Sequence, residues 1–157
     1  MLETLMKLRE EKRFEEARDL MERTLEREPD NAVYQYQMAW CYDNLGLEKE
    51  AVPHYELAIQ IGLPAKELEG AYLGLGSTYR VLGRHDEAAD TLKEAMFVFP
   101  KSETFKVFYS MVLYNFGQYQ QAMEVLLHAL VHTTNDESIL TYKKAILFYS
   151  DKLDQVW

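Results

Sequence analysis

The chain has 157 residues, 48% hydrophobic and 13% aromatic, so it is long enough for one domain with a core and too apolar to be disordered. Its 26 acidic residues outnumber 17 Lys and Arg, and the net charge of -9 argues against nucleic acid and anionic membrane surfaces as partners. A single cysteine excludes an intramolecular disulfide, and no segment has the character of a signal peptide or a transmembrane helix, so we expect a cytoplasmic protein.

Apolar residues recur at steps of three and four along the chain, which predicts helices rather than strands. The segments with this period form four pairs and a last helix, which together make a single domain over residues 1–157. The expected pairs span about 1–30, 31–63, 69–100 and 103–134, and the last helix spans about 136–153.

Residue types that cap helix N-termini stand where several of these helices should begin. Such residues precede the second pair, the fourth pair and the last helix, at Asn31, Ser102 and Asp136. One apolar stripe is expected along the last helix, formed by Ile139, Tyr142, Ile146 and Tyr149. We interpret this helix as a cap that covers the apolar flank of the fourth pair.

The four pairs repeat one pattern when they are aligned on the turn inside each pair. The anchors of this alignment, spaced 34, 37 and 34 residues apart, are Lys12, Gly46, Gly83 and Gly117. Alanine recurs five positions after each anchor, at Ala17, Ala51, Ala88 and Ala122. Small residues also stand seven positions before three anchors, at Ala39, Gly76 and Ser110. We therefore predict a helical repeat array in which small residues let paired helices cross closely.

This pattern resembles the tetratricopeptide repeat, which places small and aromatic residues at set positions of a 34-residue helix pair. The resemblance covers nearly the whole chain. It implies an all-α right-handed superhelical solenoid of antiparallel helix pairs with a C-terminal capping helix. Lys12 in place of glycine and Leu5 in place of a small residue are typical of a terminal repeat.

Some members of this family bind the C-terminal carboxylate of a chaperone tail through Lys, Asn and Arg side chains. The matching positions here hold Gln37, Gly70, Gly74, Thr104 and Phe108. Because the basic residues are missing, the chain does not resemble those members.

The first helix of each stacked pair lines the concave side of such an array. The inward positions of the second, third and fourth pairs are rich in apolar and aromatic residues. We predict that they form one partner-binding groove, lined by Tyr36, Trp40, Leu73, Val107, Phe108, Met111 and Tyr114. Polar side chains that would fix the backbone of a ligand lie alongside, at Asp43, Asn44, Arg80 and Asn115. An alternative interpretation is that part of this strip is core between units, or that the tail with Trp157 covers it.

The sequence predicts no catalytic residue, no cofactor site and no metal site. His128 and His132 have the spacing of helical metal ligands, with Glu124 one turn before, but no fourth ligand is evident. Cys41 is interpreted as a buried structural thiol. Three glycines fall inside a predicted helix and are interpreted as close-packing positions: Gly70, Gly74 and Gly76.

These observations predict a non-catalytic protein–protein interaction module, an adaptor or scaffold that binds a peptide or helix of a partner in its concave groove. The alternatives are a small secretion-type chaperone that shields an apolar client segment, a homo-oligomerising scaffold such as a homodimer, and a regulatory subunit of an enzyme. The excess of acidic residues favours a partner with basic flanks.

Overall fold

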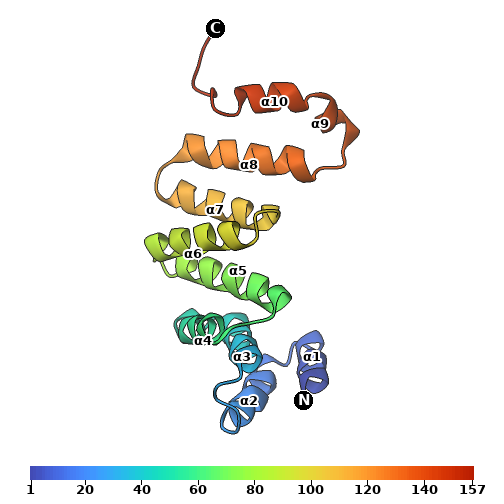
Figure 1. Cartoon of the computed structure of the whole chain (residues 1–157), viewed down its shortest axis with the longest axis vertical. Coiled ribbons are helices and arrows are strands. Elements are labelled where there is room, and N and C mark those ends of the chain that lie inside the picture. The colour runs from blue at the N-terminus through green and yellow to red at the C-terminus, as the bar shows by residue number, and fades with distance from the viewer. The chain divides into compact units, whose positions relative to one another are not determined.

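The structure, a computed structural model that describes residues 1–157, is entirely α-helical, with ten helices and no strand (Figure 1). The chain forms two compact units, Met1–Arg84 and His85–Trp157. The helices of the first unit are α1 (Leu2–Glu10), α2 (Phe14–Leu25), α3 (Ala32–Asn44), α4 (Glu48–Ile61) and α5 (Ala65–Val81). Those of the second are α6 (His85–Val98), α7 (Glu103–Asn115), α8 (Tyr119–Thr133), α9 (Glu137–Thr141) and α10 (Lys143–Tyr149). The predicted all-α chain of successive helices is confirmed.

Each helix of the first unit packs on the next along the chain, and α3 also contacts α5. One cluster of buried side chains joins the first three helices, made of Leu5, Ala17, Met21, Met38 and Cys41. Full burial of a side chain the size of Leu or Met stabilises the fold by about 1.5–3 kcal/mol. This nearest-neighbour packing is the arrangement that a repeat array requires.

In the second unit α6 packs on α7, α7 packs on α8, and α10 packs on α8 and α9. Its fully buried side chains include Phe105, Val112 and Leu113 of α7 and Val131 of α8. The contact between α10 and α8 confirms that the C-terminal segment caps the last helix pair.

The four anchor residues of the repeat share one backbone conformation. Lys12, Gly46, Gly83 and Gly117 all have positive φ, at 58°, 70°, 76° and 74°. In the second turn the N–H of Gly46 donates to the carbonyl of Asp43 at 3.1 Å, and the next N–H donates to the carbonyl of Tyr42 at 3.0 Å. The same two bonds recur at the other three anchors. This is the Schellman arrangement, so each anchor ends the first helix of its pair in the same way.

The structure places residues 65–68 in helix α5, so the boundary expected at residue 69 lies inside a helix. Pro64 stands at the N-cap with a φ of -56°. Proline is tolerated at a helix start because the first N–H groups have no intrahelical partner. The extra residues between the second and third pairs therefore lengthen α5 to 17 residues.

The C-terminal cap consists of two short helices, so the prediction of one helix over residues 136–153 was wrong. The Oγ1 of Thr141 donates to the carbonyl of Glu137 at 2.8 Å, a bond that bends helices, and α9 ends there. Because the break changes the helical phase, the predicted stripe does not form one buried face: Tyr142 is 66% exposed and Tyr149 is 49% exposed.

The predicted N-caps behave differently from one another. The side chain of Asn31 accepts from the N–H of Tyr34 at 3.2 Å, and that of Asp136 accepts from the N–H groups of Ser138 and Ile139. Ser102 stands at the N-cap of α7 without a side-chain hydrogen bond to the helix. The sequence therefore located all three helix starts, but only two of the capping bonds form.

Candidate functional site

Trp40 of α3 is held between two residues of the first helix pair. The guanidinium carbon of Arg9 lies 3.8 Å from the centroid of the indole ring. The ring of Phe14 meets the indole edge-on, with centroids 6.2 Å apart. Arg9 also donates through Nη2 to the carbonyl of Gln37 at 3.2 Å, so the cation is fixed on the aromatic face. The half-buried indole is thus a rigid aromatic side chain with part of its surface exposed.

Tyr36, one turn before Trp40, reaches from α3 to α5. A Cβ added at Gly70 would collide with the Tyr36 hydroxyl and lie 3.1 Å from its Cζ atom. The ring of Tyr36 also lies against that of Tyr55, with centroids 6.2 Å apart. Gly70 is therefore a close-packing position, as the sequence predicted.

Asp43 joins three helices of the first unit. Its Oδ2 atom accepts from the hydroxyl of Tyr55 on α4 at 2.6 Å, and its Oδ1 atom accepts from Thr78 on α5 at 3.0 Å. Burial raises the pKa of Asp43, and these two hydrogen bonds act in the opposite direction by favouring the ionised form. Both carboxylate oxygens therefore have partners inside the unit, and binding of a ligand backbone by Asp43 stays a prediction.

Neither Tyr55 nor Thr78, which hold Asp43, belongs to the groove predicted from the sequence. Tyr55 belongs to the repeat column nine positions after the anchor, in which the other members are Met21, Leu92 and Leu126. It is 2% exposed and packs over Gly74, where an added Cβ would lie 2.5 Å from the phenol Cζ and Oη atoms. Two features of the sequence signal this contact. Tyr55 stands in a repeat column whose other members are aliphatic, and a glycine stands on the neighbouring helix.

The other predicted groove residues of the first unit lie on α3 and α5. Leu73 and Arg80 of α5 are half-buried. Asn44 is exposed, and its Nδ2 donates to the carbonyl of Trp40 at 2.8 Å. Because α3 and α5 are in contact, the structure brings these residues into one compact unit.

The predicted groove residues of the second unit all lie on α7. Val107 and Phe108 are half-buried, Met111 is 38% exposed and Tyr114 is 63% exposed. The ring of Tyr114 lies against that of Tyr119, with centroids 5.0 Å apart. Asn115 is exposed as well. These side chains belong to a different unit from those on α3 and α5, so one strip across all three helices stays a prediction.

The residues considered for other chemistry have structural contacts. The ring of His128 lies 6.0 Å from that of His132, and its Nε2 atom lies 3.2 Å from the hydroxyl of Ser150. No group of three or more His, Cys, Asp or Glu side chains is arranged to hold a metal ion. Cys41 is fully buried and burial raises the pKa of its thiol, which agrees with a structural thiol.

The C-terminal tail with Trp157 was one candidate for covering the predicted groove. Trp157 is 81% exposed, and its ring lies against that of Phe148 of α10, with centroids 6.1 Å apart.

No helix of the structure combines the length and the apolar character needed to cross a membrane.

Comparison with protein families finds that residues 31–153 match the family described as Tetratrico peptide repeat. A comparison with curated proteins found no match.

Solved structures resemble the chain over nearly its whole length. YrrB, described as a TPR protein with an unusual peptide-binding site, has a TM-score of 0.70 at 18% identity, over 94% of this chain and 75% of YrrB. MamA has a TM-score of 0.67 at 17% identity, over 96% of both chains. The structure of Naa15/Naa10 bound to HypK-THB has a TM-score of 0.53 at 20% identity, over 96% of this chain and 24% of that one. At these identities the likeness concerns the fold.

Proposed function

This chain belongs to the tetratricopeptide repeat family, and on that premise we propose that it is a non-catalytic adaptor or scaffold that binds a peptide or helix of a partner protein. The family's fold is that of a protein-interaction scaffold, and YrrB, one of the similar structures, is described as having a peptide-binding site. We place it in the cytoplasm because its only cysteine is an unpaired buried thiol.

The observation that carries the proposal is the exposure of apolar side chains at the positions of α7 predicted to face inward. Met111 and Tyr114 lie three residues apart, which places them on the same helix face. Met111 and Tyr114 remain 38% and 63% exposed, whereas apolar side chains that serve only the hydrophobic core are buried. Side chains of Tyr and Trp dominate binding energies where they are presented on a rigid scaffold. Trp40, held by Arg9 and Phe14, meets that description in the first unit.

The test begins with selection of binding peptides from a random library on the wild-type protein, followed by titration of the selected peptide. We expect Met111→Glu to weaken its binding at least tenfold, because a charge in an apolar contact must be desolvated. The matched control is Phe97→Glu on α6, where the side chain is 87% exposed. Circular dichroism should show equal helicity and an unchanged midpoint for both variants. Equal binding by the two variants would place the peptide elsewhere and refute the groove.

A further inference from the structure

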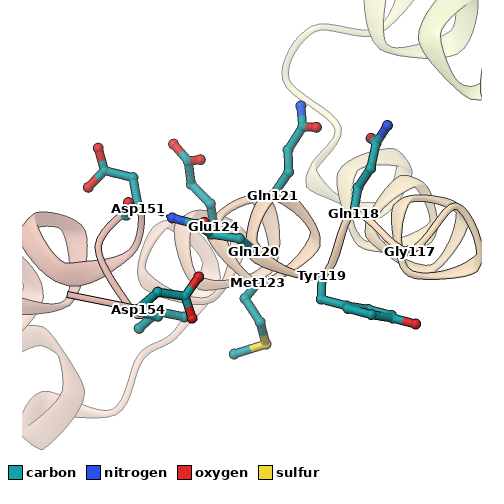
Figure 2. A pocket seen from close by; sticks show the side chains of 10 residues that line it. Gly117, Gln118, Tyr119, Gln120, Gln121, Met123, Glu124, Asp151 and Asp154 are labelled. Atoms are coloured by element: carbon teal, nitrogen blue, oxygen red, sulfur yellow. Dashed lines mark hydrogen bonds between the residues drawn. The ribbon is translucent and has the colours of Figure 1, made fainter.

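The segment that follows α10 is fastened to α8 and leaves a hollow beside it. Ser150 is 1% exposed and contacts His128, and Nε2 of Gln120 donates to the carbonyl of Asp151 at 2.8 Å. The hollow has a volume of about 850 Å³, within the size range of ligand sites (Figure 2). It is lined by Gly117, Gln118, Tyr119, Gln120, Gln121, Met123, Glu124, Asp151, Leu153 and Asp154. All of these residues belong to the second unit.

The hollow carries negative charge without a positive lining residue. Its carboxylates are those of Glu124, Asp151 and Asp154, and no Lys, Arg or His lines it. Lys152 pairs with Asp151 at 2.5 Å, so one carboxylate is compensated. The other two carboxylates form no ion pair in the structure. Two uncompensated carboxylates beside one hollow favour a cationic occupant.

The same hollow offers apolar surface. Tyr119, Met123 and Leu153 are 59%, 43% and 48% exposed. Figure 2 shows the side chains of Gln121, Glu124 and Asp151 extending to one side of α8, and those of Met123 and Tyr119 to the other. An occupant that fills both parts needs a positive charge and an adjacent apolar group.

We propose that this hollow binds a Lys or Arg side chain of a partner protein, presented on a segment with apolar neighbours. The charged end of the Lys or Arg side chain meets the carboxylates of the lining, Glu124 and Asp154, and the apolar neighbours on the same segment pack on Met123 and Tyr119 at the other side of α8. An acidic peptide would be repelled by these carboxylates, and a second copy of a chain with net charge -9 is disfavoured for the same reason. This surface adjoins the predicted inward positions of α7 that carry the proposed function, because the ring of Tyr119 lies against that of Tyr114.

The probes are three fluorescent peptides of equal length, with alternating Lys and Leu, Gln and Leu, or Glu and Leu. Fluorescence anisotropy at low salt measures their binding to the wild type, to the double variant Glu124→Gln, Asp154→Asn, and to the matched control Glu26→Gln, Asp90→Asn. Both double variants remove the same net charge. None of the four positions takes part in an ion pair, so we expect circular dichroism to show an unchanged fold.

We expect the Lys-Leu peptide alone to bind the wild type and the control. The pocket double variant should bind it roughly two- to thirtyfold more weakly, the range for two exposed charge pairs. Amide chemical shifts should move at Gln120, Glu124 and Asp154 on addition of this peptide. Equal weakening in both double variants would show attraction to the net charge only, and equal binding of the Gln-Leu peptide would show an apolar contact only. Either result overturns the proposal, as does a set of shifted amides confined to other helices.

Discussion

Substitution of Gly74 by Ala tests the hydrogen-bonded junction between α3, α4 and α5. An isolated Gly-to-Ala change inside a helix stabilises it by about 1 kcal/mol. Here the added Cβ would lie 2.5 Å from the Tyr55 phenol, well inside van der Waals contact. Tyr55 is 2% exposed and donates to Asp43, so its ring has no free space to enter and loses this bond if it moves.

The expected loss follows from three contributions. Overpacking of a buried site costs about 1–3 kcal/mol, and loss of a hydrogen bond to a charged group costs about 1.5–3 kcal/mol. Set against the helix gain of about 1 kcal/mol, we expect Gly74→Ala to destabilise the protein by about 1.5–5 kcal/mol. For a chain of this size that corresponds to a drop in Tm of about 3–20 °C.

The assay is thermal and urea unfolding followed by circular dichroism, with Gly70→Ala as the matched control. The Cβ added at Gly70 meets the end of the half-buried Tyr36 side chain, whose hydroxyl makes no hydrogen bond and can move. We expect that variant to stay within about 1 kcal/mol of the wild type, because the helix gain offsets the displacement. If Gly74→Ala is as stable as Gly70→Ala, the junction does not depend on the Tyr55 position, and the reasoning fails.

Three further predictions concern the first turn, the half-buried His54 and the C-terminal cap. Lys12→Gly should raise the free energy of unfolding by about 0.5–1 kcal/mol. The backbone strain of a lysine at positive φ is relieved, and this gain exceeds the entropy that glycine adds to the unfolded chain. Unchanged urea midpoints would contradict this prediction. Burial holds the pKa of His54 below its ordinary value of 6.5, so its contribution to stability is full above that pH and is lost as the pH falls; His54→Gln should flatten the stability profile between about pH 7 and 5, and parallel profiles would count against it. Deletion of residues 135–157 should expose the flank of α8 and cause aggregation detectable by light scattering, whereas a monomeric truncation of equal stability would show that the cap is dispensable.

The repeat could be located from the sequence because its turns demand a rare backbone conformation. Glycine at Gly46, Gly83 and Gly117 supplies positive φ without strain, and the equivalent Lys12 adopts it as well. The small residues of the alignment lie inside the helices and are buried where helices pack together, with Ala17, Ala51 and Ala88 fully inaccessible. Local chemistry of this kind is visible in one sequence.

Interactions between helices were much less predictable. Nothing in the local pattern shows that Asp43 meets Tyr55 and Thr78, because that meeting depends on which side chains share a face after packing. The end of α9 at Thr141 was missed because the apolar spacing continues through it, and spacing does not report a side chain that bonds to its own backbone. The candidate groove could not be established from the sequence for the same reason, because the exposure of Met111 and Tyr114 depends on how the helices pack.

The Asp43 junction has a consequence for how such a chain can evolve. Repeat arrays grow and shrink by duplication and deletion of whole units, which succeeds when neighbouring units are interchangeable. Here a carboxylate on α3 needs a phenol on α4 and a hydroxyl on α5. The other three helix pairs carry different residues at the position of Asp43, namely Arg9, Arg80 and Tyr114. Moving the second helix pair away from α5 would leave Asp43 without Thr78, and replacing that pair would leave Thr78 without its acceptor. The order of repeats at this junction is therefore under chemical constraint.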